Sequence, residues 1–368
     1  MSKKKLKIGV LFGGKSAEHE VSLQSARNVI EALDKNKYEV VPIGITKEGK
    51  WLLSNISNYL LNSNNPKLIK LNKSNKEVAL YAEGHGNLAV PGGNSKEQKK
   101  IDVIFPVMHG PFGEDGSMQG LLKLTGIPYV GAGVLGSAVG MDKEVMKRLL
   151  RDSGIPIGKF ITVRAGDKIS FVKVKKELGL PVFIKPANMG SSIGVSKARN
   201  EIEFKQALRE AFKYDTKILV EEFIDAREIE CAVLGNSRPI ASVPGEIIAN
   251  QEFYSYDAKY IDEGSVAVIP AKLDKKITRK VQELALRTFQ VLSCEGMGRV
   301  DCFLKKNGDV LVNEINTIPG FTDISMYPKL WEATGIPQSQ LLDMLINLAV
   351  ERFDKEQKLK TKNFGVIR

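Results

Sequence analysis

Apolar runs alternate with an amphipathic stretch in the first third of the chain. Leu6–Phe12 is a mostly apolar run, Val21–Leu33 carries apolar residues at helical spacing, and Tyr38–Ile45 is a second apolar run. A strand, a helix and a strand in this order form a βαβ unit, whose two strands lie parallel in one sheet. Ile101–Val107 is a further apolar run that we expect to form a strand. The pattern therefore predicts a Rossmann-like parallel sheet.

A smaller α/β unit is predicted in the middle of the chain. A helix that begins at Met141–Lys143 ends before Gly154 and Pro156, two residue types that terminate helices. Several short apolar runs follow it, and the glycine-rich loop Asn188–Gly194 joins the first two. The predicted strands are Leu180–Ala187, a strand from Val195, Ile218–Phe223 and Glu228–Leu234, with a short hinge at 224–227.

Two amphipathic helices and a hairpin are predicted near the carboxyl end. Asp274–Cys294 and Pro337–Phe353 each carry an apolar stripe at helical spacing. Between them, Arg299–Leu304 and Val310–Ile315 flank Asn307-Gly308, a pair that favours a two-residue hairpin turn. We expect the first of these helices to back the sheet that contains the hairpin.

The predicted hairpin sets two carboxylates opposite each other. With a two-residue turn, Asp301 lies across from Glu314 and Arg299 lies across from Asn316, all on one face. Opposed Cβ atoms are about 4.5–5.5 Å apart, a distance at which like charges destabilise a sheet. Mg²⁺ prefers carboxylate and amide oxygens, so we interpret Asp301, Glu314 and Asn316 as a metal site. The alternative is an edge hairpin whose acids point into solvent.

Composition and charge exclude several classes of protein. The chain has 368 residues, of which 43% are hydrophobic and 26% charged, as in a soluble protein of two or three domains. No apolar run reaches the length of about 18 residues that a membrane span needs. Cys231, Cys294 and Cys302 show neither disulfide nor zinc spacing, so we expect a cytoplasmic location. The net charge of +11 is spread along the chain, so we expect no nucleic-acid partner and no membrane partner.

Two glycine-containing loops are candidate ligand sites, because glycine lets backbone N–H groups approach a ligand. Gly13–Ser22 follows the first strand and places Glu18 before a helix, where a carboxylate also complements the helix dipole. This loop lacks the third glycine of a dinucleotide fingerprint. The later loop follows a strand that carries Lys185, and Ser191 and Ser192 add hydroxyl donors suited to phosphate. An ordinary glycine hairpin is the alternative.

These motifs resemble those of D-alanine–D-alanine ligases, a family of the ATP-grasp superfamily. The resemblance covers nearly the whole chain apart from residues 54–100 and implies an α/β and α+β organisation. It implies an ATP-grasp fold behind the amino-terminal sheet, with domains at residues 1–130, 131–222 and 223–368. The similar stretches are Gly13–Ser22, the loop His109–Gly116, Lys185 with Gly190–Gly194, the Ala258-Lys259-Tyr260 segment, and Gly298–Ser325 with its Asn313-Glu314-Ile315-Asn316-Thr317 run.

The resemblance also implies roles for individual residues. Glu18 would hold the ammonium group of the first substrate, while Arg299 and the Gly320 N–H would stabilise a tetrahedral oxyanion. From composition alone, the residues around Glu221 would be an acidic surface patch, and His109 a polar residue that satisfies a turn. The implied substrate-binding and catalytic residues are Glu18, His109, Ser192, Lys259, Tyr260, Arg299, Gly320, Ser325 and Met326. The implied ATP-binding residues are Lys143, Lys185, Ser191, Ser192, Glu221, Glu222, Ile224 and Glu228.

The expected reaction joins two D-alanines through an acyl phosphate, with ATP and two Mg²⁺ or Mn²⁺ ions, for peptidoglycan precursor synthesis. The polar segment 244–271 is expected to close over the site as a lid. The expected partners are D-alanine, ATP and a second copy of the chain, because dimers are common in the family. A D-alanine–D-lactate ligase is an alternative, which Tyr260 disfavours. Another ATP-grasp carboxylate–amine ligase and a non-catalytic nucleotide-binding protein are further alternatives.

Overall fold

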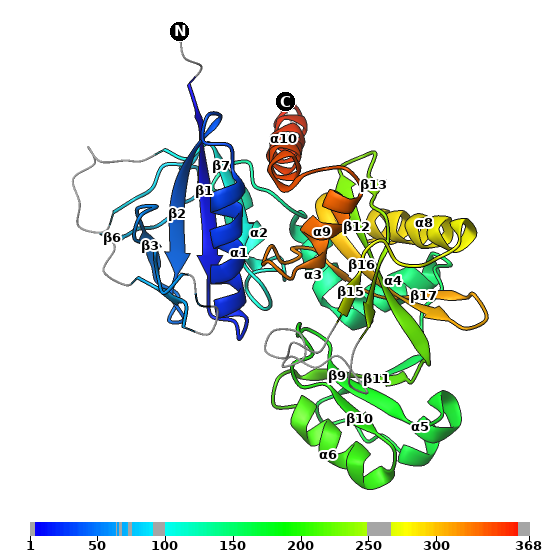
Figure 1. Cartoon of the computed structure of the whole chain (residues 1–368). Coiled ribbons are helices and arrows are strands. Elements are labelled where there is room, and N and C mark those ends of the chain that lie inside the picture. The colour runs from blue at the N-terminus through cyan, green and yellow to red at the C-terminus, as the bar shows by residue number, and fades with distance from the viewer. Residues whose placement is uncertain are drawn as a thin grey trace, which may run out of the picture.

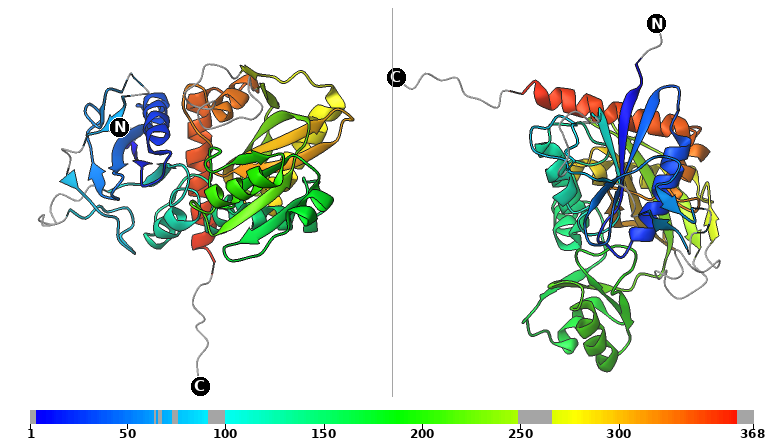
Figure 2. Two further views of the ribbon diagram at one scale, coloured as in Figure 1. Left: turned by 90° about the horizontal axis from the view of Figure 1, so that it is seen from below. Right: turned by 90° about the vertical axis from the view of Figure 1, so that its left-hand side faces the viewer.

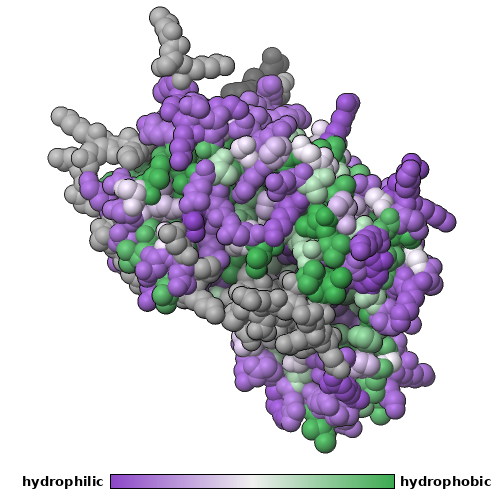
Figure 3. Space-filling model, viewed as in Figure 1, coloured by the Kyte–Doolittle hydropathy of each residue, from purple (hydrophilic) through white to green (hydrophobic). Residues whose placement is uncertain are grey.

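A computed structural model describes residues 4–63, 65, 68–72, 76–90, 100–248 and 266–359 of the protein. Three larger β-sheets follow one another along the chain, with five, four and six strands (Figure 1). The face shown in Figure 3 is mostly hydrophilic, with apolar residues in scattered groups. Within the described ranges, every helix is too short or too polar to cross a membrane.

The amino-terminal sheet has the strand order β6-β3-β2-β1-β7, and β1 is parallel to both β2 and β7. This confirms the predicted βαβ unit and parallel sheet. The antiparallel strands β3 and β6 lie at one edge, and β4 and β5 pair separately. The elements are β1 (Leu6–Gly13), α1 (His19–Ala32), β2 (Tyr38–Ile45), β3 (Trp51–Leu53), β4 (Leu60–Leu61), β5 (Lys70–Leu71), β6 (Lys76–Glu77), β7 (Val103–Val107) and α2 (Ser117–Leu124).

The four-stranded sheet is antiparallel, in the order β10-β9-β11-β8, and two helices pack against it (Figure 1). β9 and β10 flank the glycine-rich loop, as predicted. The elements are β8 (Phe160–Arg164), α5 (Phe171–Leu178), β9 (Val182–Pro186), β10 (Ser196–Ala198), α6 (Glu201–Ala211) and β11 (Lys217–Glu222).

The six-stranded sheet contains the predicted hairpin as β16 and β17. Helix α8 packs on β12, β16 and β17, which confirms that this helix backs the hairpin. The Asp274 carboxylate caps α8 by accepting from the N–H of Ile277 at 2.8 Å. The elements are β12 (Ala226–Gly235), β13 (Ile240–Ala241), β14 (Gly245–Ile248), β15 (Val266–Val268), α8 (Lys275–Val291), β16 (Gly296–Lys305), β17 (Val310–Asn316), α9 (Met326–Ala333) and α10 (Gln338–Gln357).

Near the site, one boundary and one helix differ from the prediction. β12 begins at Ala226, so the hinge between β11 and β12 is shorter than expected. Helix α3 (Val134–Met141) was not predicted, because Gly136 and Gly140 lower the helical propensity of this segment. It ends beside Asp142, whose side chain caps the predicted helix α4 (Lys143–Asp152). Sequence periodicity alone therefore merged the end of α3 with the start of α4.

The amino-terminal and carboxyl-terminal sheets share one hydrophobic core. Phe105 of β7 packs edge-on against Phe321, with ring centroids 6.0 Å apart. Helix α10 lies between the two parts (Figure 2), and its buried Arg352 donates to the carbonyls of Gly131 (2.5 Å) and Tyr129 (2.8 Å). This shared core brings α1 next to the turn that follows β17.

Candidate nucleotide- and substrate-binding site

The β16–β17 hairpin brings the predicted metal-binding residues onto one face. Arg299 lies across from Asn316, and Asp301 lies across from Glu314. These four side chains are partly exposed, whereas the intervening Val300 is buried against the helices. The predicted pairing is therefore confirmed.

The turn that produces this pairing was predicted wrongly. The N–H of Lys305 donates to the carbonyl of Asp309 at 2.8 Å, so the reversal contains three residues rather than two. Gly308 has a φ of 82°, as in three-residue loops that end on a left-handed residue. Nearer the site the register shifts by one residue, because Asn313 forms a β-bulge. The bulge cancels the error in the turn and restores the predicted opposition.

Cationic side chains accompany both opposed carboxylates. Arg299 donates two hydrogen bonds of 2.7 Å to Asp301, and the amide of Asn316 donates to Asp301 at 3.0 Å. Nζ of Lys143 lies 3.5 Å from Oε2 of Glu314. These contacts offset the repulsion between the acids, so their juxtaposition alone does not require a metal ion.

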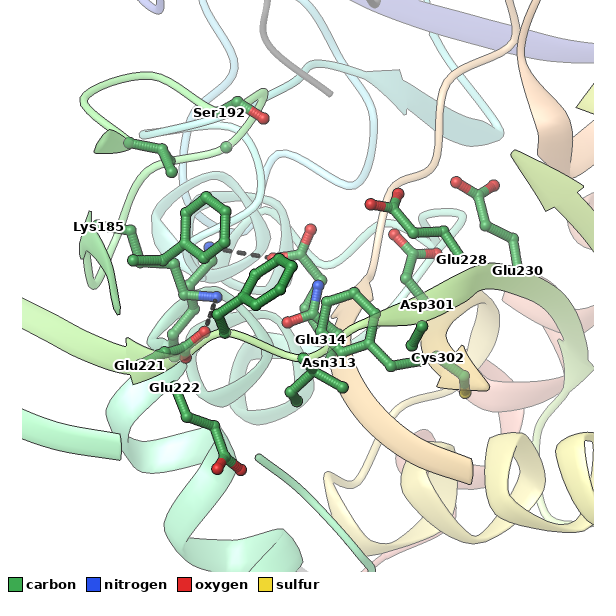
Figure 4. A pocket seen from close by; sticks show the side chains of 18 of the residues that line it. Lys185, Ser192, Glu221, Glu222, Glu228, Glu230, Asp301, Cys302, Asn313 and Glu314 are labelled. Atoms are coloured by element: carbon green, nitrogen blue, oxygen red, sulfur yellow. Dashed lines mark ion pairs between the residues drawn. The ribbon is translucent and has the colours of Figure 1, made fainter. Parts of the chain in front are cut away.

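A pocket of about 340 Å³ lies between the glycine-rich loop, the β11–β12 connection and the hairpin (Figure 4). One part of its wall is apolar, with Phe183, Phe223 and Phe303, and another part carries charged side chains. Such a mixed lining suits a ligand with an aromatic end and an anionic end. The predicted residues that line it are Lys143, Lys185, Ser192, Glu221, Glu222, Ile224, Glu228, Asp301 and Glu314.

Two lysines share one carboxylate beneath this pocket. Lys185 of β9 lies 2.8 Å from one oxygen of Glu221, and Lys147 of α4 lies 3.2 Å from the other. The side chain of Lys147 is only 2% exposed. Burial lowers the pKa of Lys147, although Glu221 acts in the opposite direction. Burial would raise the pKa of Glu221, but the two lysines lower it overall, so the carboxylate is charged at neutral pH.

The glycine-rich loop reaches across to the amino-terminal part. Ser191 donates a hydrogen bond to Glu18. A Cβ atom added to Gly190 would lie 3.0 Å from the same carboxylate, so the loop backbone passes close to Glu18. Ser191 and Ser192 both have positive φ values, 48° and 59°, which hold the loop in a tight arch. The described hydroxyl contact to Glu18 comes from Ser191, whereas Ser192, which the resemblance assigns to both substrate and ATP, lines the pocket.

Glu18 and His109 lie close together at the ends of β1 and β7. Glu18 is buried just before α1. Nδ1 of the buried His109 lies 3.1 Å from the carbonyl oxygen of Ile318 and 3.5 Å from Glu114. Burial alone would lower the pKa of His109, but Glu114 and Glu18 raise it overall. This places a histidine that is more readily protonated than usual beside the predicted first-substrate carboxylate.

The turn that contains Gly320 lies against α1. The N–H of Phe321 donates to Oγ of Ser25 at 3.2 Å, and Asn28 donates to the carbonyl of Phe321 at 2.9 Å. On the other side, a Cβ atom added to Gly320 would come within 2.7 Å of the hydroxyl of Ser325, so any larger residue would have to displace that hydroxyl. The hydroxyl of Ser325 accepts from the N–H of Thr322 at 2.9 Å.

The predicted residues thus form two neighbouring groups. One group lines the pocket, and the other surrounds Glu18 and the Gly320 turn; Ser191 of the glycine-rich loop connects them. Met326 is buried in the shared core at the start of α9 rather than lining the pocket. Lys259 and Tyr260 lie outside the described residues, as does most of the predicted lid.

Sequence reasoning missed four residues that hold the predicted ones in place. Lys147 was not predicted, because nothing in the sequence distinguishes a buried lysine from a solvated one on an amphipathic helix. Glu230, opposite Asp301 on β12 and 3.0 Å from Arg299, could have been predicted from strand alternation, since it lies two residues after Glu228. Ser25 and Asn28 act across the contact between domains, which no local pattern reveals.

Family models of D-alanine–D-alanine ligases match most of the chain. The model described as "D-ala D-ala ligase N-terminus" matches residues 7–132, and "D-ala D-ala ligase C-terminus" matches residues 149–347. A relative from Oceanobacillus iheyensis named D-alanine–D-alanine ligase is 53% identical over 360 residues. That alignment covers 97% of this chain and 98% of the relative.

Solved structures of ligases resemble the whole fold. The D-alanine–D-alanine ligase of Coxiella burnetii superimposes with a TM-score of 0.84 at 39% identity and covers 97% of each chain. A D-alanine–D-alanine ligase of Bacillus anthracis complexed with ATP gives a TM-score of 0.72 at 30% identity. It covers 96% of this chain and 100% of that one.

Proposed function

The chain belongs to the family of D-alanine–D-alanine ligases, and on this premise we propose that it joins two D-alanine molecules into D-alanyl-D-alanine. ATP drives the reaction and leaves as ADP and phosphate. Membership of the family confirms the expected ATP-grasp fold and the expected class of ATP-dependent ligase. The product is a precursor of peptidoglycan.

One observation carries the proposal: the glycine-rich loop connects the charged pocket to the buried Glu18. Lys143 and Lys185 suit the phosphates of ATP, since both lysines line the pocket. Glu18 lies on the far side of the same loop, where its carboxylate suits the ammonium group of an amino acid. An amino acid held there would have its own carboxylate near the terminal phosphate.

The donor set of the hairpin fits Mg²⁺. Asp301 and Glu314 supply carboxylate oxygens at the pocket, and Asn316 contributes an amide on the same face. Glu230, opposite Asp301 on β12, pairs with Arg299 at 3.0 Å. When bound, Mg²⁺ would neutralise charge on the phosphate oxygens of ATP. We propose Asp301, Glu314 and Asn316 as its ligands, with Mn²⁺ as a possible substitute.

In the first step, the carboxylate of the first D-alanine attacks the γ-phosphorus of ATP. An acyl phosphate forms, and the bond from the γ-phosphorus to the bridging oxygen breaks, so ADP leaves. Lys143 and Lys185 stabilise the negative charge of the transferred phosphoryl group. Ile224 and Glu222 offer backbone groups to adenine, and Glu221 and Glu228 offer carboxylates to the nucleoside.

In the second step, the neutral amine of the second D-alanine attacks the acyl carbon; the bond from this carbon to the phosphate oxygen breaks, and phosphate leaves with the proton that the amine loses as the peptide bond forms. Arg299 and the N–H of Gly320 stabilise the oxyanion of the tetrahedral intermediate. Asp301 and Glu230 orient the guanidinium group of Arg299. Ser325, at the start of α9, binds the carboxylate of the second D-alanine. In this proposal Lys259 and Tyr260 belong to the lid, which excludes water from the acyl phosphate.

The proposal also covers the division into domains, the oligomeric state and the location in the cell. The chain divides into a first-substrate domain (residues 1–130), a phosphate-loop domain (131–222) and a metal-site domain (223–368). It acts as a homodimer. It acts in the cytoplasm, where ATP is available, and its three described cysteines are buried and free, as in a reducing compartment.

The decisive assay measures phosphate release from ATP and Mg²⁺ in the presence of single D- and L-amino acids, with the dipeptide identified by mass. We expect release and D-alanyl-D-alanine formation with D-alanine, and neither product with L-alanine. Adding D-lactate to D-alanine tests the depsipeptide alternative, in which an ester product would appear. Phosphate release that needs a different carboxylic acid would overturn the choice of substrate while leaving the ATP-grasp chemistry in place.

A further inference from the structure

Side chains of the amino-terminal part hold the turn between β17 and α9 at several backbone groups. His109, at the end of β7, contacts the carbonyl of Ile318 at 3.1 Å. Ser25 of α1 accepts from the N–H of Phe321, and Asn28, one turn further along α1, donates to the carbonyl of Phe321. The peptide group of Gly320 therefore lies between backbone groups of Ile318 and Phe321, which are held by side chains of the amino-terminal part.

Asn28 has the larger share of these contacts. Its amide nitrogen donates both to the carbonyl of Phe321 and to the carboxylate of Asp323, each at 2.9 Å. Both partners are acceptors, so the position requires a donor. Ser25 is fully buried, and its hydroxyl also lies 3.2 Å from Nε2 of His109, which links Ser25 to the residue that contacts Ile318.

The same helix begins beside the first-substrate site. Glu18 immediately precedes α1, and Ser25 and Asn28 lie two and three turns further along it. A rigid helix thus spans from the carboxylate at one side of the reaction to the turn at the other. Any displacement of the turn relative to α1 changes where the N–H of Gly320 points with respect to a substrate held at Glu18.

We infer that Ser25 and Asn28 are positioning residues that fix the Gly320 N–H on the reacting carbonyl, an inference that depends on the function proposed above. Neither side chain is among those that line the pocket, and both contact the backbone of Phe321. An oxyanion donor loses most of its effect when it is misplaced by about 1 Å, an error that lowers a rate by roughly a hundredfold. These two residues should therefore influence the rate of turnover more than the binding of ATP.

The test compares Asn28→Asp with the wild type and with a matched control. The substitution keeps the shape of the side chain but places a carboxylate against two acceptors. We expect kcat for dipeptide formation to fall by about tenfold to a hundredfold, with KM for ATP and the thermal midpoint close to those of the control. The control is Arg27→Ala, on the same helix, which removes hydrogen bonds to Glu31 (2.9 Å) and to the carbonyl of Ser63 (2.8 Å) instead.

Two additional variants keep the inference testable if Asn28→Asp folds poorly. Asn28→Ala removes the donor without adding charge, and Ser25→Ala removes the acceptor for the Phe321 N–H. A fall in kcat for either variant at an unchanged thermal midpoint supports positioning. An active wild type whose Asn28 and Ser25 variants turn over like Arg27→Ala would overturn this inference alone. A wild type that forms no dipeptide would overturn the proposed function and this inference with it.

Discussion

The two halves of the site are held together by different kinds of interaction. Around the pocket, charged side chains pair with one another: the buried Lys147 and Lys185 share Glu221, and Lys143 accompanies the partly exposed Glu314. Around the Gly320 turn, the contacts are hydrogen bonds from serine and asparagine side chains to backbone groups. The first half lies within the two carboxyl-terminal sheets, whereas the second joins them to the amino-terminal sheet.

This difference predicts how each half responds to change. Removing one member of a buried charge cluster leaves an uncompensated charge, which is strongly destabilising. Removing a neutral donor costs much less stability but shifts the backbone that it held. The pocket should therefore lose stability and nucleotide binding when it is mutated, and the turn should lose catalytic rate.

The largest effect is expected at the hairpin, where charge serves the reaction itself. We expect Glu314→Gln to retain the fold and to lower kcat/KM by about a thousandfold, or about 4 kcal/mol, because a carboxylate ligand for Mg²⁺ is lost. Phosphate release measured over a range of Mg²⁺ concentrations tests this. The control is Asp309→Asn, at the far end of the same hairpin, where no change in activity is expected. Near-normal turnover of the Glu314 variant at low Mg²⁺ would contradict the metal assignment.

Glu221 tests whether the charge cluster beneath the pocket stabilises the fold. Glu221→Gln leaves Lys147 buried without its carboxylate partner, so we expect a loss of about 3 kcal/mol in the free energy of unfolding at pH 7. Urea unfolding measures it. The control is Glu222→Gln, because the neighbouring Glu222 accepts only from the backbone N–H of Lys159 (2.8 Å) among the hydrogen bonds described.

The pH dependence gives this prediction a second readout. The lysines lower the pKa of Glu221 below 4.5 in the folded protein, although burial acts in the opposite direction. Its stabilising contribution is therefore present above pH 4.5 and is lost as the pH falls through the lower folded pKa. The difference between the wild type and Glu221→Gln should shrink with acidification below pH 4.5. A difference that stays constant would show that the carboxylate acts through packing and not through charge.

The elements that line the pocket were predicted well, because local patterns in the sequence encode them. Strand alternation placed Asp301 and Glu314 on one face, and glycine spacing identified the loop after β9. The prediction of their pairing succeeded through two errors of equal size, since the three-residue reversal and the bulge at Asn313 cancel. A β-bulge has no reliable signal in a single sequence, so the register was correct without the correct turn.

The contacts around the Gly320 turn were harder to predict from the sequence. Ser25 and Asn28 lie on α1, and their partners lie almost three hundred residues further along the chain. A serine or an asparagine on a helix is ordinarily a solvated residue or a local hydrogen-bonding one. Their role follows from the contact between the amino-terminal and carboxyl-terminal sheets, which no local pattern in the sequence predicts.

Ser191 connects the two halves, and its removal sharpens the comparison between them. Ser191→Ala removes the hydrogen bond to the carboxylate of Glu18, a type of bond that contributes about 1.5–3 kcal/mol. We expect KM for D-alanine to rise by roughly tenfold or more, with a smaller change in KM for ATP. The matched variant is Ser192→Ala, whose side chain lines the pocket and which should affect KM for ATP more. Equal effects of both variants on both KM values would contradict the separation of the two halves.

His109 is the titratable member of the Gly320 half, and it should produce the smallest effect. Glu114 and Glu18 raise its pKa above 6.5, despite its burial. Its stabilising contribution is thus complete below pH 6.5 and is lost as the pH rises through the folded pKa. We expect His109→Gln to remove about 1 kcal/mol of this pH-dependent stability, measured by urea unfolding between pH 5.5 and 8.5. The control is His85→Gln, at an exposed histidine. The free energy of unfolding of His109→Gln could instead change with pH as that of the wild type does. The protonated imidazole would then not be what holds the carbonyl of Ile318, and the contacts around the Gly320 turn would all be neutral.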